Sequence, residues 1–134
     1  MKQESPVKIK WFPKESDMSC SETVLRMGLD KLQIDSADAL KISSTFGGGI
    51  AGLGEVCGAV TGGIFTIGLC YGRKDDSRSN EEVRNFTKEF CQTFEKEFTY
   101  IRCSDLTFRL EINERRKKCR EMVKFATEQL YKLL

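Results

Sequence analysis

Hydrophobic residues recur at helical spacing along two long stretches of the chain. In the first stretch they fall at every third or fourth position: Val83, Phe86, Phe90, Phe94 and Phe98. In the second, which begins at about Asn113, they share one face: Cys119, Met122, Val123, Ala126, Leu130 and Leu133. A stripe with this period is typical of an amphipathic helix that buries one side. We therefore predict two long helices in the C-terminal half.

Earlier in the chain, serines mark the starts of two further helices. Ser19 and Glu22 have the spacing of a capping box, and an apolar stripe follows them to about Gln33. A second helix can begin at Ser36, and the glycines that start at position 47 end it. This arrangement puts Cys20 in the first turn of a helix.

Residues 56–71 are almost entirely apolar, which predicts a third, buried helix. Another capping-box pattern, at residues 79–82, precedes the phenylalanine-rich helix. The segment LTFRLEI alternates apolar and polar residues as a strand does. Because no second strand is apparent, we predict a short helix or an irregular segment after Cys103.

Together these patterns predict an all-α fold. It is a compact helical bundle of four long helices plus one or two short ones, with a glycine-rich central helix. The length of 134 residues suits one domain. We place it at residues 18–134, behind a polar N-terminal arm at 1–17 that Trp11 and Phe12 can dock onto the body.

Composition excludes several classes of function. The chain has no histidine, which rules out Ser-His-Asp and Cys-His nucleophiles, histidine zinc sites and histidine-ligated haem. A net charge of +2 is too small to indicate nucleic-acid binding. The uncharged run at 56–71 is shorter than the roughly 20 residues that span a bilayer. The N-terminus lacks the apolar region of a secretory signal, so we expect a cytoplasmic protein without membrane contact.

Ten of the eleven glycines lie between positions 47 and 72. Gly47, Gly49 and Gly52 spell G-x-G-x-x-G, but that motif binds nucleotides only between a strand and a helix of a parallel sheet. We therefore expect no nucleotide. Gly58, Gly62 and Gly68 keep the central helix thin, either around a bound group or simply at a tight helix crossing.

The six cysteines form no Cys-x-x-Cys pair. Cys20 and Cys57 are each predicted in a first helical turn, where the helix dipole favours the thiolate. Cys103, which follows Arg102, has the same predicted setting. Cys70 follows Leu69 in the apolar helix and Cys91 lies between Phe90 and Phe94, and both are predicted to be small buried hydrophobes.

Cys119 lies on the inward face of the last predicted helix. Arg115 and Arg116 precede it by four and three residues, which is one helical turn. Their positive charge can bias this thiol toward the thiolate. For the arginines alone, a solvated basic surface is the simpler interpretation.

The order of these residues resembles the C_GCAxxG_C_C family of redox-active proteins from Cys20 onward. One cysteine opens the first helix, Cys57-Gly58-Ala59-Val60-Thr61-Gly62 matches the family's central element, and two cysteines follow in the C-terminal third. The resemblance implies redox chemistry at four cysteines: Cys20, Cys57, Cys103 and Cys119. Gly58, Ala59 and Gly62 would support them.

Three functions remain open. The four cysteines could hold zinc or an iron–sulfur cluster for electron transfer. Alternatively, Cys57 could attack a disulfide or peroxide, with Cys20 or Cys119 as the resolving thiol. The third alternative is a helical interaction module. Either redox hypothesis requires the four thiols to converge and a redox partner protein to exist, and the apolar helix faces leave a homodimer open.

Overall fold

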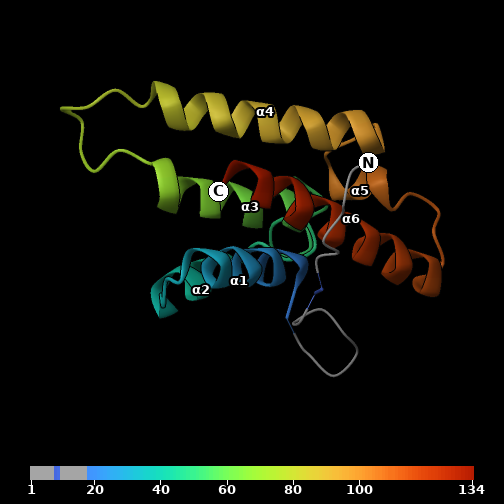
Figure 1. Cartoon of the computed structure of the whole chain (residues 1–134). Helices are drawn as coiled ribbons and strands as arrows, with labels where there is room; N and C mark the ends of the chain where they lie inside the picture. Colours follow the sequence, from blue (N-terminus) through green and yellow to red (C-terminus); the bar gives the residue numbers. More distant parts are fainter. Residues whose placement is uncertain (1–7, 10–17) are drawn as a thin grey trace, which may run out of the picture.

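The computed structural model describes residues 8–9 and 18–134. In that part the chain forms six helices (Figure 1): α1 (Cys20–Leu32), α2 (Ala37–Ser43), α3 (Gly58–Tyr71), α4 (Glu81–Phe98), α5 (Cys103–Leu106) and α6 (Ile112–Leu133). Four are long and two are short, so the predicted all-α bundle is confirmed. The predicted arm at 1–17, including Trp11 and Phe12, lies outside the described residues except for positions 8 and 9. There, Ile9 packs against the core.

Side-chain caps start three of the helices. Before α1, the Ser19 hydroxyl accepts from the N–H of Glu22, whose carboxylate accepts in turn from the N–H of Ser19, as the sequence predicts. Before α2, the Ser36 hydroxyl accepts from the N–H of Ala39 at 3.1 Å. Before α6, Glu111 and Glu114 form a capping box of their own, so this helix begins one residue earlier than predicted.

Two predicted helix starts differ from the structure. The capping box predicted at 79–82 does not form. The N-cap of α4 is Asn80, and the Ser79 hydroxyl instead accepts from the Glu81 N–H at 3.0 Å. Helix α3 begins at Gly58 rather than at position 56, because Val56 forms an isolated antiparallel bridge with Arg102. This bridge makes Cys57 the N-cap of α3.

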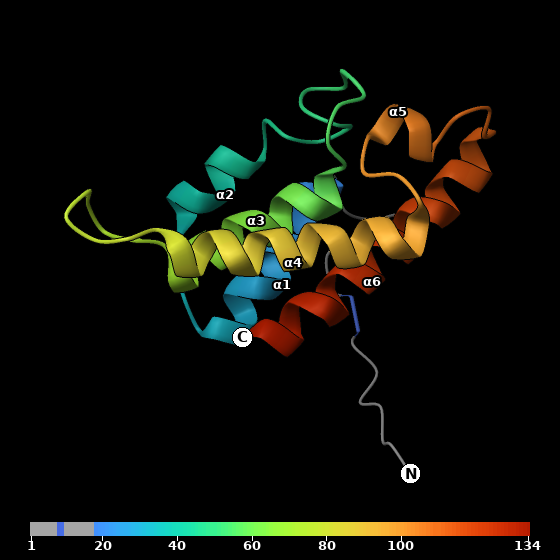
Figure 2. The same cartoon turned by 90° about the horizontal axis from the view of Figure 1, so that it is seen from above.

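Helix α3 is the centre of the bundle. It contacts α1, α2, α4 and α6, and Figure 2, seen from above, shows α4 lying over it. Eight of its residues are buried: Gly58, Ala59, Val60, Thr61, Gly62, Gly63, Thr66 and Ile67. The glycine-rich central helix is therefore confirmed.

Glycines let α1 and α3 approach closely. A Cβ on Gly62 would lie 2.5 Å from the Ser21 carbonyl oxygen, and a Cβ on Gly28 would lie 2.4 Å from the Thr66 hydroxyl oxygen. Both distances are far below van der Waals contact. Gly68 has no such neighbour within 4 Å among the described residues, so the small size predicted to matter there allows no close contact with them.

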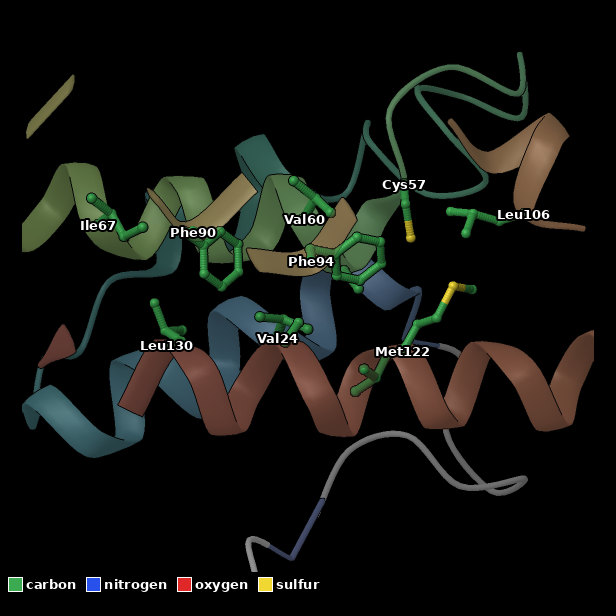
Figure 3. Close-up of a cluster of buried hydrophobic side chains, with 12 residues drawn as sticks. Val24, Cys57, Val60, Ile67, Phe90, Phe94, Leu106, Met122 and Leu130 are labelled. Atoms are coloured by element: carbon green, nitrogen blue, oxygen red, sulfur yellow. The ribbon is translucent and has the colours of Figure 1, made fainter. Parts of the chain in front are cut away.

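The core is formed by apolar side chains from all the long helices. Figure 3 shows Val24 of α1, Ile67 of α3, Phe90 of α4 and Leu130 of α6 pointing toward one another. The apolar faces of α4 and α6 are therefore core inside one chain. In the part of the chain that the structure describes, no helix combines the length and the apolar character that crossing a bilayer requires.

Candidate functional site

The four family cysteines are positioned by four different helices. Cys20 is the first residue of α1, Cys57 is the N-cap of α3, Cys103 is the first residue of α5, and Cys119 lies in the N-terminal half of α6. Cys57 and Cys103 are buried, with 3% and 9% of their surface exposed, whereas Cys20 and Cys119 are half-buried. Solvent therefore reaches one side of the group.

Backbone hydrogen bonds hold the segments of Cys57 and Cys103 side by side. The N–H of Cys57 donates to the Ile101 carbonyl at 2.8 Å, and the N–H of Cys103 donates to the Glu55 carbonyl at 2.6 Å. The Arg102 guanidinium lies 3.5 Å from the Glu55 carboxylate, in a pair that is about half exposed. These contacts place the start of α5 against the start of α3.

Two glycines bring the backbone against the cysteines. A Cβ on Gly58 would lie 3.1 Å from the Cβ of Cys20, so this motif glycine allows α3 to start beside the start of α1. Gly49 has a φ of +75°, and its Cβ would lie 2.8 Å from the Cβ of Cys103. Both the left-handed backbone and the lack of space require glycine there. The backbone of the G-x-G-x-x-G segment therefore packs against the side chain of Cys103 at Gly49.

A hydroxyl pair also joins α3 to α1 next to the cysteines. The Thr61 and Ser21 side chains are buried, and a hydrogen bond of 3.2 Å connects their oxygens. The Thr61 hydroxyl also lies 3.1 Å from the Gly58 carbonyl. Sequence reasoning missed both residues; the signal was a polar Thr61 within an otherwise apolar helix, since a buried hydroxyl needs a partner.

The thiols of Cys20 and Cys119 approach one another across the α1–α6 contact, closely enough for each to shift the pKa of the other. The negative charges that Cys57 and Cys103 would carry on ionisation also act on Cys20. Cys57 in turn is within electrostatic range of Cys103 and Cys119. The four thiols therefore lie within electrostatic range of one another.

The helix-start thiols do not favour the thiolate as predicted. Burial raises the pKa of Cys57 to about 12. The N–H groups of Ala59 and Val60 lower this pKa in part, but they make no capping hydrogen bond to the side chain. Donating to Cys119, together with burial, also raises the pKa of Cys20. Desolvation of a thiolate therefore outweighs the helix dipole at both positions.

Cys119 is the thiol whose ionisation the site favours. The hydrogen bond from Cys20 is the largest cause, and it lowers the pKa of Cys119 to about 7 in spite of burial. Positive charge from Arg115, Arg120 and Lys118 acts in the same direction. Arg115 thus has the predicted effect, whereas Arg116 is not among these three cations.

The other two cysteines, Cys70 and Cys91, differ in how far they are exposed to solvent. Cys91 is half-buried and packs against the core, whereas Cys70 is exposed, so its predicted burial is wrong. Cys70 follows Leu69 at the end of α3, where the helix emerges from the bundle. Figure 3 shows the side chains of Cys57 and Met122 pointing toward one another. A thioether of the core therefore adjoins the buried thiol.

Among the described residues, no group of three or more cysteine or carboxylate side chains has a geometry that could hold a metal ion. The Cys20–Cys119 contact is thus a pair within a looser group of four thiols. Such a pair can exchange two electrons by forming a disulfide.

The fold and this group of thiols define a helical protein with four neighbouring cysteines at the starts and within the first half of its helices. The model of the family described as "Putative redox-active protein (C_GCAxxG_C_C)" matches residues 18–133. The chain belongs to this family. Neither a curated protein nor a solved structure matches it.

Proposed function

We propose that this chain is a thiol–disulfide redox protein in which Cys119 is the attacking thiol and Cys20 the resolving thiol. The observation that carries the proposal is the approach of these two thiols across the α1–α6 contact. A resolving thiol must reach the attacking sulfur, and this contact brings the two sulfur atoms together. The lowered pKa of Cys119 supports the same assignment, because the thiolate is the nucleophile.

The assignment of roles differs from the sequence hypothesis, which has Cys57 attacking. A buried thiol with a pKa of about 12 remains protonated at neutral pH. Cys119 is half-buried and has cations beside it. Cys57 and Cys103 then act as neighbours that surround the Cys20–Cys119 pair.

The test is mild oxidation of the purified protein followed by proteolysis without reductant and mass spectrometry. We expect the free thiols to fall from six to four, with one new peptide that links Cys20 to Cys119. Cys20→Ser and Cys119→Ser should each abolish this link. Cys70→Ser and Cys91→Ser are matched controls and should retain it. A disulfide between other cysteines, or no loss of thiols, would refute the assignment.

A metal-holding function for Cys20, Cys57, Cys103 and Cys119 is the second candidate, because the four thiols lie within electrostatic range of one another. Iron, zinc and acid-labile sulfide measured on anaerobically purified protein separate the two functions. A stoichiometric metal that disappears in Cys57→Ser would replace the thiol proposal. Under the thiol proposal, Cys57→Ser keeps the Cys20–Cys119 link.

A further inference from the structure

Beside the thiol pair, the N-terminal half of α6 combines a group of cations with a surface cavity. From this combination we infer that the substrates of the Cys20–Cys119 pair are small anionic disulfides. The inference rests on the proposed thiol–disulfide function and adds the class of substrate.

The first observation is the charge around the half-buried Cys119. Arg115, Lys118 and Arg120 are close enough to act electrostatically on its sulfur. Among the described residues, none of these three cations makes an ion pair with a carboxylate. Their field is therefore available to an approaching anion, and such fields raise the rate at which oppositely charged substrates arrive.

The second observation is a cavity of about 340 Å³ between the end of α4, α5 and α6. Its wall combines aromatic, aliphatic and charged side chains: Tyr100, Asp105, Leu106, Phe108, Leu110 and Lys118. This volume lies near the lower end of the range for small-molecule sites. Lys118 lines the cavity and directly precedes Cys119 in α6, so the cavity lies beside the same turn of α6 as the reactive thiol.

The cavity wall favours a molecule with an apolar body and an anionic end. Phe108 is 69% exposed, and the guanidinium of Arg109 lies 5.1 Å from the centre of its ring. Lys118 is the one cation and Asp105 the one carboxylate among the lining residues. The guanidinium of Arg109 beside Phe108 adds a second positive charge near the cavity.

The reaction balances without a further reagent. The Cys119 thiolate attacks one sulfur of the substrate, an S–S bond forms between them, and the first substrate thiolate leaves. Cys20 loses its proton to solvent and attacks the Cys119 sulfur of this mixed disulfide, which expels the second thiolate. The protein dithiol is oxidised by two electrons, and the substrate disulfide is reduced to two thiols.

Three disulfides of nearly equal size test the inference: 3,3′-dithiodipropionate is a dianion, bis(2-hydroxyethyl) disulfide is neutral, and cystamine is a dication. The rate of Cys20–Cys119 disulfide formation is measured with each by mass spectrometry. Each protein rate is divided by the rate at which the same disulfide reacts with a free cysteine derivative. This division removes differences in the intrinsic reactivity of the three disulfides. At about 10 mM salt, where the Debye length is roughly 30 Å, the dianion should exceed the dication about tenfold or more. At about 1 M salt this preference should shrink.

Charge variants locate the origin of the preference. Arg115→Gln and Lys118→Gln should each lower the ratio of the dianion rate to the neutral rate. This ratio is independent of the thiolate fraction, since both disulfides meet the same Cys119. Asp105→Asn should raise it. Lys117→Gln removes the same charge from the opposite side of α6 and should change the ratio least.

The outcomes separate the two proposals. If all three disulfides oxidise the Cys20–Cys119 pair at equal relative rates, or if cystamine is fastest, the substrate class is wrong and the thiol function stands. If none of the three forms the Cys20–Cys119 disulfide, the thiol function fails and the substrate class fails with it.

Discussion

At the scale of single residues, two neighbouring thiols differ in charge because one donates and the other accepts. The thiol of Cys20 remains protonated and donates, which stabilises negative charge on Cys119. Cys57, only 3% exposed, lacks the solvent that would stabilise its thiolate. Nucleophilicity at this site therefore follows from hydrogen bonding and access to solvent more than from position at a helix start.

This difference predicts how alkylation depends on pH. The pKa of Cys119 is lowered to about 7, so its rate with iodoacetamide should reach half its plateau near that pH. Below it, the rate should fall about tenfold per pH unit as the thiol becomes protonated. Cys57, with a pKa of about 12, should remain unmodified. Peptide mass spectrometry of each cysteine at a series of pH values measures both.

Removing the groups that stabilise the thiolate should move this midpoint upward. Cys20→Ala removes the hydrogen bond and should raise the midpoint most, because that bond is the largest cause of the lowered pKa. Arg115→Gln should raise it by less. Lys117→Gln is the control with the same loss of charge. An unchanged midpoint in Cys20→Ala would show that the Cys20 thiol does not set the ionisation of Cys119.

At the residue scale, the sequence predicts which cysteines follow the family pattern but not how they titrate. Arg115 lies one turn before Cys119, and spacing alone places the two on one helix face. The burial of Cys57 depends on side chains from distant parts of the chain, such as Leu106 and Met122 of the core. No local pattern contains that information.

At the scale of elements, the pairing of α1 with α3 determines where Cys20 meets the start of α3. Gly58 lies against Cys20, and Gly62 lies against the carbonyl of Ser21 one turn later. The sequence predicts that these glycines thin a helix. It does not indicate which partner approaches, because Gly68 fits the same pattern and has open space beside it.

The two kinds of glycine should respond oppositely to alanine. In Gly62→Ala the new Cβ would meet the Ser21 carbonyl oxygen at 2.5 Å, so α1 and α3 must separate, at a cost of about 1–3 kcal/mol. In Gly68→Ala the Cβ meets nothing within 4 Å, and helix propensity should stabilise the protein by about 1 kcal/mol. Urea unfolding of both variants measures these changes. Equal effects would show that α1 and α3 are not in tight contact.

At the scale of the whole molecule, four helices that are distant in sequence bring their cysteines to one place. Hydrophobic periodicity predicts α1, α4 and α6, because each buries a continuous stripe, and the almost entirely apolar run at 56–71 predicts α3. The association of α5 with the loop before α3 was not predictable, since it depends on the Val56–Arg102 bridge and its backbone hydrogen bonds. Such backbone pairing does not depend on a periodic pattern of side chains, so the sequence does not indicate it.

The Cys20–Cys119 disulfide would connect α1 to α6 and close a loop of about 100 residues. Helices α1 and α6 are already in contact, and near the other end of α1 the Tyr131 hydroxyl donates to the Met27 carbonyl at 3.1 Å. Oxidation would therefore restrict the unfolded chain without requiring a new arrangement of helices. We expect the free energy of unfolding to rise by about 2–4 kcal/mol.

Urea unfolding of the reduced and oxidised protein measures this gain as an upward shift of the midpoint by about 1–2 M. Cys119→Ser treated with the same oxidant is the control, and its midpoint should not move. Cys91→Ser should keep the full shift. A midpoint that is equal or lower after oxidation would mean that the bond strains the α1–α6 contact. The fold would then favour the dithiol form. The protein's disulfide would oxidise other thiols more readily than an unstrained disulfide does.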